Sequence, residues 1–210
     1  MFTLAQARGW YPEKDGVHGF DHIERVYRLC EKIGPAEGAE MDILLTAALM
    51  HDASGSHPGE GNRSGHHNHS ARFARQKLEQ AGWEEEKIQA VEHCIRAHRY
   101  RKGEPAETIE AKVLFDADKL DVIGAIGVTR ALAYAFQVGT PAYAEPSRQF
   151  LDTWKKEKGE LHSAYHEYLF KLSKIESILI TDSAKILAAH RQQYLNGFFE
   201  ELADEMNNKK

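Results

Sequence analysis

An adjacent histidine and aspartate end an apolar run in this 210-residue sequence. Residues 44–50, LLTAALM, lead directly into His51 and Asp52, and Ala-Ser-Gly-Ser follows. A helix with this interior is largely buried, so we expect the pair at the edge of a core. A carboxylate there needs a counter-charge, a metal ion or hydrogen bonds, because burying it alone is costly. Taken alone, the pair also fits an ordinary hydrogen-bonded helix end.

Two more polar residues stand in apolar helical surroundings: His22 within residues 21–33 and Asp118 within residues 109–137. With the pair they form a set of two imidazoles and two carboxylates. This mixture of nitrogen and oxygen donors suits Mn, Fe, Co, Ni or Zn, and four protein ligands leave octahedral positions for water and a substrate oxygen. The four residues therefore indicate a site for one divalent ion.

The helix that carries the pair has to end there. Neighbouring residues point about 100° apart on an ideal helix, so His51 and Asp52 can share an ion only where the helix bends or stops. Residues 53–65, ASGSHPGEGNRSG, predict that stop and a long loop after it. Loops of this length in compact domains are often functional lids or pocket walls.

Helical periodicity dominates the whole sequence and strand-like alternation is nearly absent, which predicts an all-α fold. Gly34-Pro35 is expected to end the first helix. No linker divides the chain, so we predict one domain over residues 1–210, with a core at about 18–135 and C-terminal helices at about 147–204 packing on it. The predicted helices span residues 21–33, 39–52, 67–81, 84–98, 109–137, 148–158, 160–171 and 174–204.

Composition excludes several classes of protein. The chain is 42% hydrophobic and 28% charged with a net charge of −5, as expected of a globular protein without a basic surface for a nucleic-acid polymer. No segment reaches the roughly 20 apolar residues of a membrane span, and the N-terminus has no secretion signal. Cys30 and Cys94 lack ligand spacing and are interpreted as reduced core residues. We therefore expect a cytoplasmic protein without a membrane partner.

The order of the four candidate ligands resembles a known signature. His22, the His51-Asp52 pair and Asp118 look like the H…HD…D pattern of the HD superfamily of metal-dependent phosphohydrolases. Residues 115–130, FDADKLDVIGAIGVTR, are similar to a segment of small stand-alone bacterial HD hydrolases, in which the last metal aspartate lies in an Ala-Asp-Lys/Arg-Leu context. Residues 19–26 resemble their first-ligand helix and residues 171–191 their closing helices, so the resemblance covers nearly the whole chain.

The resemblance implies an all-helical HD-domain bundle with the metal site between its helices. It implies His22, His51, Asp52 and Asp118 as metal ligands, with Mn favoured and Fe, Co, Ni, Zn or Mg as alternatives. The implied partner is a small phosphorylated substrate, most often a nucleotide. Release of pyrophosphate from a nucleoside triphosphate and removal of a terminal phosphate are the leading reactions. A bound divalent ion activates water and polarises a phosphoryl oxygen, so such a reaction needs no protein nucleophile.

Residues close to these ligands receive supporting roles. Asp121, about one turn beyond Asp118, is expected to orient water or a ligand, whereas Asp116 is expected to be hydrogen-bonded and structural. Lys119 either pairs with the adjacent ligand or holds a phosphate. Arg25 either braces a carboxylate or phosphate near the site or forms a surface ion pair.

A histidine-rich stretch follows the pair. Related two-metal HD enzymes draw extra histidines from this region and from the next helix, so a second metal ion is one alternative. Solvated surface histidines are another. Our preferred interpretation is that His69 and His98 contact phosphate or water. The histidines concerned are His57, His66, His67, His69 and His98.

Two rival functions remain. A cyclic-nucleotide phosphodiesterase is one, although the Gly-Tyr-Pro motif of the cyclic-dinucleotide branch is absent from this sequence. A non-catalytic nucleotide-sensing HD module is the other, and the retention of all four ligands argues against it. The apolar C-terminal helices at about 147–204 could pack within the chain or form a homodimer.

Overall fold

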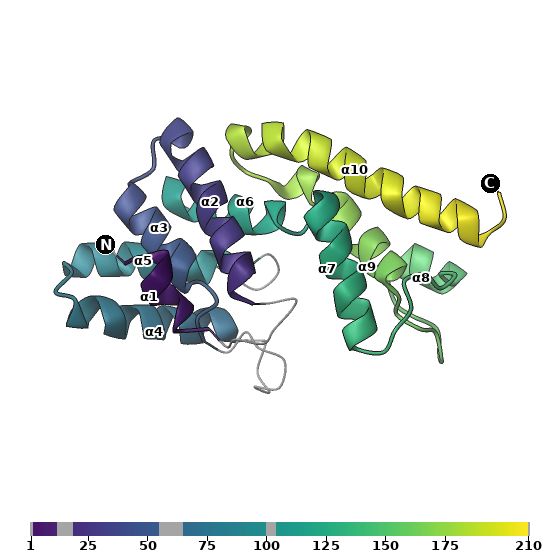
Figure 1. Ribbon diagram of the computed structural model, residues 1–210, viewed down its shortest axis with the longest axis horizontal. Helices are drawn as coiled ribbons and strands as arrows, with labels where there is room; N and C mark the ends of the chain where they lie inside the picture. Colours follow the sequence, from purple (N-terminus) through teal and green to yellow (C-terminus); the bar gives the residue numbers. More distant parts are fainter. Residues whose placement is uncertain (1, 12–18, 55–64, 100–103, 210) are drawn as a thin grey trace. The chain divides into compact units, whose positions relative to one another are not determined.

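The computed structural model describes residues 2–11, 19–54, 65–99 and 104–209. All regular structure within these ranges is helical, which confirms the predicted all-α class. The chain divides into two compact units (Figure 1): residues 1–119 with 180–184, and residues 120–179 with 185–210. The prediction of a single domain over residues 1–210 stays a prediction.

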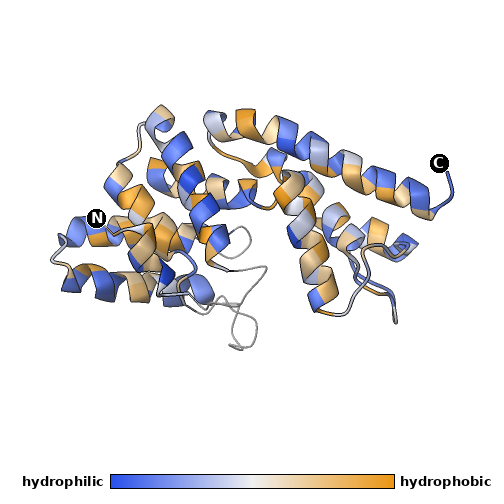
Figure 2. Cartoon of the chain, viewed as in Figure 1, coloured by the Kyte–Doolittle hydropathy of each residue, from blue (hydrophilic) through white to orange (hydrophobic). Residues whose placement is uncertain are grey.

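The first unit is built around a short apolar helix, α3. Every residue of α3 from Ile43 to Met50 is buried, and most of the helix is coloured as apolar in Figure 2. Helices α2, α4 and α5 pack against it, and α4 also packs along α5. The helices of this unit are α1 (Leu4–Arg8), α2 (Phe20–Glu37), α3 (Met41–Met50), α4 (His66–Gln80), α5 (Glu85–Ala97) and α6 (Ile109–Leu120).

The second unit has its own aromatic core. The rings of Tyr168 and Phe199 stack with centroids 4.6 Å apart, and Phe150 packs against the buried His166 ring at 4.6 Å. Its elements are α7 (Gly124–Gln137), α8 (Arg148–Thr153), α9 (Ala164–Phe170), the 3₁₀ turns η1 (Leu172–Lys174) and η2 (Glu176–Ile178), and α10 (Asp182–Met206), whose first three residues belong to the first unit.

Helix α2 does not end at Gly34-Pro35, and that prediction is wrong. Gly34 is buried against α3, where a Cβ would lie only 2.6 Å from Leu44 Cδ2, so close packing holds this turn helical. Pro35 removes one backbone donor but lies in the last turn of the helix. The helix ends at Gly38, with φ of 74°, whose N–H donates to the Pro35 carbonyl at 3.4 Å.

The predicted long helix over residues 109–137 is two helices, α6 and α7. Gly124 starts α7 with a left-handed φ of 74°, a conformation that glycine adopts without steric cost. A Cβ there would lie 3.2 Å from the Arg191 side chain, and Arg191 donates to the Leu120 carbonyl at 2.7 Å. The break therefore depends on an arginine about seventy positions away in the sequence, which periodicity cannot detect.

The last helix begins at Asp182 and not near residue 174. The buried Asp116 carboxylate accepts the backbone N–H groups of Ile180, at 2.9 Å, and Thr181, at 2.7 Å, together with the Thr181 hydroxyl. These bonds hold Ile180 and Thr181 outside any helix, after the two 3₁₀ turns. Asp116 is thus hydrogen-bonded and structural, as predicted.

The helices predicted at 148–158 and 160–171 are shorter than expected, because α8 ends at Thr153 and α9 begins at Ala164. The predicted lid loop falls mostly on residues 55–64, which lie outside the described residues, as does His57. Within the described ranges, none of the helices is long and apolar enough to cross a membrane.

Candidate metal centre

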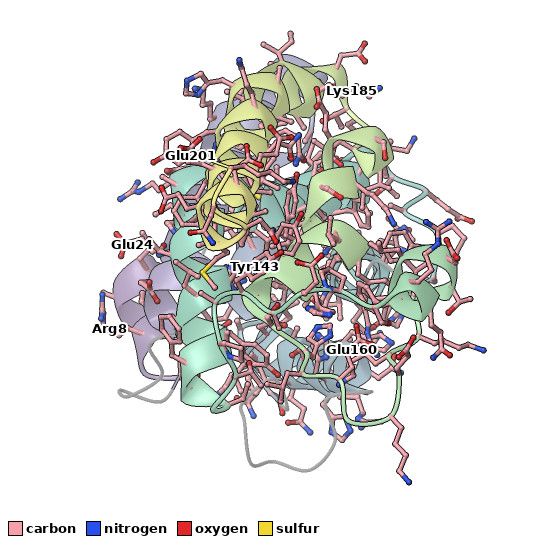
Figure 3. The ribbon with its side chains drawn as sticks, turned by 90° about the vertical axis from the view of Figure 1, so that its right-hand side faces the viewer. Arg8, Glu24, Tyr143, Glu160, Lys185 and Glu201 are labelled. Atoms are coloured by element: carbon pink, nitrogen blue, oxygen red, sulfur yellow. The ribbon has the colours of Figure 1, made fainter. Side chains whose placement is uncertain are left out.

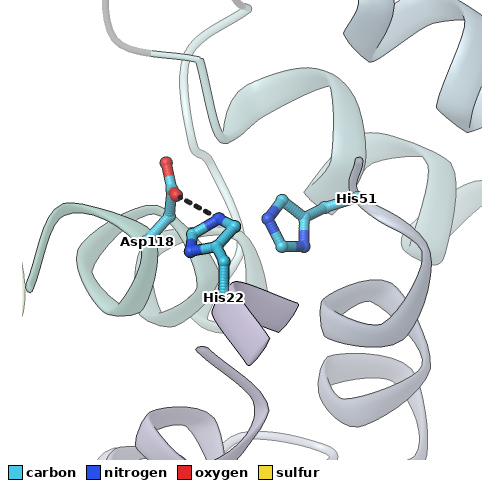
Figure 4. A group of neighbouring side chains, drawn as sticks. All are labelled: His22, His51 and Asp118. Carbon is cyan, nitrogen blue, oxygen red and sulfur yellow. Dashed lines mark ion pairs between the residues drawn. The ribbon is translucent and has the colours of Figure 1, made fainter. Parts of the chain in front are cut away.

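Three helices of the first unit bring His22, His51 and Asp118 together (Figure 4). His22 lies in the first turn of α2, His51 directly follows α3, and Asp118 lies in the last turn of α6. One ligand atom from each residue lies within 4.8 Å of the others, and His22 Nε2 is 3.4 Å from Asp118 Oδ1. When ligand atoms lie 2.0–2.1 Å from one metal ion, neighbouring ligand atoms are about 3.0–3.4 Å from each other. The distance between His22 Nε2 and Asp118 Oδ1 is in this range, so side-chain adjustments would let the group bind one ion.

A second group of donors lies beside the first and consists of Asp52, His66 and His98. Asp52 Oδ1 is 3.4 Å from His66 Nε2 and 3.6 Å from His98 Nε2. The other Asp52 oxygen lies 4.0 Å from His51 Nε2, and the His51 and His98 rings are 5.1 Å apart. The Asp52 carboxylate therefore presents one oxygen to each group of donors.

Backbone carbonyls fix the orientation of two of these imidazoles. His51 Nδ1 bonds the Ala48 carbonyl at 2.8 Å, and His98 Nδ1 bonds the Ile95 carbonyl at 2.6 Å. Because a carbonyl only accepts, each Nδ1 carries the proton and each neutral ring turns the lone pair of Nε2 toward the centre. Among the described residues, the buried His51 Nε2 has no hydrogen-bond partner.

Acceptor atoms that face one another in this way fit a cation between them. Two lone pairs directed at carboxylate oxygens repel unless a proton or a metal ion intervenes. The Nδ1–H to carbonyl bond is also the arrangement that metal-binding histidines use to fix the ring and its tautomer. The donor set of the first unit therefore fits a divalent metal ion.

The electrostatics of the centre keep His51 and His98 neutral and Asp52 and Asp118 charged. Burial, followed by the neighbouring His51, lowers the pKa of His98 to about 3. Burial alone would raise the pKa of Asp52, but the surrounding imidazoles outweigh it and hold that pKa well below its usual range. Burial also acts to raise the pKa of Asp118, and Lys119 and His22 together reverse the effect.

The structure brings Lys119 to the centre. Its buried ammonium pairs with Asp118 and donates to the His98 carbonyl at 2.9 Å. Lys119 thereby joins the end of α6 to the end of α5. This is the pairing alternative among the two roles considered for Lys119.

Three other predicted site residues are members of neither group of donors, and their supporting roles stay predictions. Asp121 is buried in the second unit, where its carboxylate bonds Arg130 Nη1 at 2.6 Å. Arg25 forms an ion pair with Asp21 at 2.6 Å on the surface of α2, the second of the alternatives considered for it. His69 is exposed and belongs to neither group of donors.

Sequence reasoning named one further residue of the centre only as a member of the histidine cluster and did not find another. His66, and not His69, faces Asp52 from the first position of α4. Ser70 holds this helix start by bonding the backbone N–H and carbonyl of Ser54 at 3.2 and 3.1 Å. Tyr11, which follows α1, donates its hydroxyl to the Leu49 carbonyl at 2.8 Å. Only the cluster of histidines pointed to His66, and no local pattern pointed to Tyr11.

Comparisons with known proteins agree with this geometry. The HD domain family matches residues 19–123. The protein YpgQ of Bacillus subtilis is 30% identical over 205 residues, covering 94% of this chain and 90% of its own length. The crystal structure of YpgQ in complex with ADP has a TM-score of 0.72 at 29% identity and covers 97% of both chains. An HD-superfamily hydrolase from Bacillus thuringiensis has a TM-score of 0.69 at 27% identity, covering 97% of this chain and 94% of its own.

Fold and site together define an all-helical protein with histidine and aspartate groups that can bind a metal ion. The chain belongs to the HD-domain family and is a member of the HD superfamily of hydrolases. The resemblance found in the sequence is thereby confirmed.

Proposed function

We propose that this protein is a metal-dependent phosphohydrolase that acts on a nucleotide, with one divalent ion held by His22, His51, Asp52 and Asp118. The observation that carries the proposal is the convergence of His22, His51 and Asp118 from α2, α3 and α6, with one oxygen of the Asp52 carboxylate 4.0 Å from His51 Nε2. Mn is the favoured ion because the donors are mixed nitrogen and oxygen atoms.

The bound ion supplies Lewis acidity and lowers the pKa of water, so no protein nucleophile is required. The chain's own residues hold and orient the reactants. Lys119 balances the charge of Asp118 and fixes its direction. His66 and His98 present imidazole nitrogens next to Asp52, and the Nε2 lone pair of the neutral His98 ring can accept a hydrogen bond from water.

The substrate class is supported by a relative. YpgQ, 29% identical in its ADP complex, binds a nucleoside diphosphate. We therefore assign the phosphoanhydride of a nucleoside phosphate as the bond that is cleaved, with release of pyrophosphate or of terminal phosphate. A nucleotide is also consistent with a mildly acidic protein, since the ion neutralises phosphate charge locally.

The direct test of the assignment is Asp118→Ala. We expect this variant to lose Mn binding in calorimetry and to lose at least about 100-fold in turnover of nucleoside triphosphates, because a carboxylate that binds the ion is gone. Asp152→Ala, which removes an exposed carboxylate from α8, is the matched control and keeps wild-type activity. Full activity of Asp118→Ala would rule the ligand assignment out.

The second group of donors favours an alternative version of the proposed centre, in which two metal ions are bound. Asp52, His66 and His98 lie close enough to contribute three ligands to another ion, with Asp52 bridging. Manganese titration distinguishes the two versions by stoichiometry. One ion per chain, and a His98→Ala variant that turns over slowly but keeps its metal, supports the single-ion centre, whereas two ions per chain in the wild type and one in His98→Ala supports the bridged centre.

A further inference from the structure

The end of helix α3 departs from the regular helical hydrogen-bond pattern at three consecutive positions. In a continuing helix, the carbonyls of Ala48 and Leu49 would accept the N–H groups four residues later. Here the Ala48 carbonyl bonds His51 Nδ1, and the N–H of Ala53 turns to the Met50 carbonyl at 3.2 Å. The helix therefore stops where the two candidate ligands follow.

The Tyr11 side chain takes the place of the missing helical turn. Its hydroxyl donates to the Leu49 carbonyl at 2.8 Å, in place of the backbone N–H that a further helical turn would supply. Tyr11 is buried, so the loss of its hydroxyl would leave that carbonyl short of a hydrogen bond. One side chain thus completes the end of α3 just before His51 and Asp52.

The segment that carries Tyr11 is fixed to the first unit at several points. The Tyr11 ring packs on Phe20, with centroids 5.5 Å apart, two positions before His22. Arg8 lies 3.9 Å from Glu24 of α2 (Figure 3) and stacks over the Phe20 ring. Tyr11 therefore contacts the helix start that carries one candidate ligand and the helix end that carries two others.

We propose that Tyr11 is a positioning residue for the metal centre: its hydroxyl binds the Leu49 carbonyl, ends α3 at this turn and thereby fixes the direction of His51 and Asp52. Without that turn, His51 and Asp52 would point about 100° apart and could not share one ion. Tyr11 lies outside residues 19–123, the part that matches the family. The inference rests on the proposed function, because it assigns a role in metal binding.

The experiment compares Tyr11→Phe and Tyr11→Leu in the full chain, with Tyr27→Phe, on the partly exposed side of α2, as the matched control. Mn affinity is measured by calorimetry and stability by thermal unfolding. We expect both Tyr11 variants to bind Mn at least about 10-fold more weakly, because both lack the hydroxyl. Tyr11→Leu should unfold at a lower temperature than Tyr11→Phe, because it also lacks the ring. Saturating Mn should restore kcat in Tyr11→Phe, since every ligand is still present.

Hydrogen exchange of the Ala53 amide, which bonds the Met50 carbonyl at this turn, gives a readout in metal-free protein. We expect faster exchange in Tyr11→Phe than in the wild type and Tyr27→Phe. Mn affinity of Tyr11→Phe within twofold of wild type, or unchanged Ala53 exchange, would overturn the positioning role while the proposed function stands. A wild-type protein that binds no Mn overturns the proposed function, and with it the metal-binding role of Tyr11.

Discussion

At the residue scale, the prediction of the site depends on four candidate ligands of two types, imidazole and carboxylate, in a fixed order along the chain. His22, His51, Asp52 and Asp118 could be chosen from the sequence because each is a polar group placed in an apolar helix, and burial makes such a residue costly unless it has a partner. The structure brings them to one side of the first unit. Their role as ligands is a proposal that metal titration tests.

The choice between His66 and His69 could not be made from the sequence. The two residues are three positions apart in the first turn of α4, so both lie on a similar face. Which of them reaches Asp52 depends on how Ser70 fixes the helix start to Ser54, and that contact joins positions sixteen residues apart. A local pattern does not contain this information.

The same pair offers a matched test. We expect His66→Ala to lower nucleotide turnover about 10-fold or more, because the variant removes a nitrogen that faces Asp52. His69→Ala removes an exposed imidazole of the same helical turn and should stay within about twofold of wild type. Steady-state kinetics at fixed Mn measure both. A larger loss in His69→Ala than in His66→Ala would contradict the placement of the donors.

Asp116 and Asp118 lie two positions apart, and we expect their substitution to have different effects: loss of stability for Asp116 and loss of metal binding for Asp118. Asp116→Ala leaves the buried N–H groups of Ile180 and Thr181 and the Thr181 hydroxyl without their acceptor, so the free energy of unfolding should fall by about 3 kcal/mol or more. Asp118→Ala should lose metal and activity with a smaller change in stability. Urea denaturation measures the difference, and equal stability of Asp116→Ala and wild type would contradict the structural role of Asp116.

At the element scale, helices were predicted well where periodicity is local and poorly where a distant side chain ends them. The starts and ends of α4 and α5 lie within one or two residues of prediction. The break before α7 depends on Arg191, and the late start of α10 depends on Asp116. Pro35 misled the prediction because the packing of Gly34 against α3 keeps this turn helical, although the proline removes a backbone donor.

In the second unit, one carboxylate connects the starts of α8 and α9. Glu160 accepts the Ser147 N–H at 2.7 Å and the Glu157 N–H at 2.6 Å, and it bonds the buried His166 Nε2 at 3.1 Å. Burial acts to raise the pKa of Glu160, but the two backbone N–H groups and the two side chains outweigh it and lower the pKa to about 2.

This lowered pKa predicts a specific acid sensitivity. A carboxylate whose folded pKa lies below its unfolded value stabilises the protein fully above about pH 4.3, and that contribution is lost as the pH falls toward about 2. Glu160→Gln should therefore be less stable at neutral pH and less sensitive to acid across this window. Denaturation series from pH 6 to pH 2 test it, with the exposed Glu205→Gln as control. An acid dependence identical to wild type in Glu160→Gln would contradict the role of Glu160.

At the scale of the whole molecule, helical periodicity correctly indicated an all-α chain, and the prediction of a single domain stays a prediction. Periodicity and charge describe single helices, whereas the boundary near residues 119–120 depends on which helices contact one another. The family matches residues 19–123, nearly all of them in the first unit, which contains every donor of the candidate centre.

Metal binding should stabilise the molecule through the first unit. If Mn binds only the folded centre, an ion concentration 100-fold above Kd adds about 2.7 kcal/mol to the free energy of unfolding. Thermal unfolding with and without Mn should show this gain in the wild type and not in Asp118→Ala. A similar gain in Asp118→Ala would mean that the ion binds elsewhere.

The most direct test of the account is product analysis with the metal controlled. The protein is stripped with a chelator, reloaded with Mn, Mg, Co or Ni, and incubated with ribo- and deoxyribonucleoside di- and triphosphates, and phosphate and pyrophosphate are separated. We predict that the stripped protein is inactive and that Mn restores release of one of these products from a nucleotide. A protein that binds Mn and nucleotide but forms no product with any of the four metals would contradict the account.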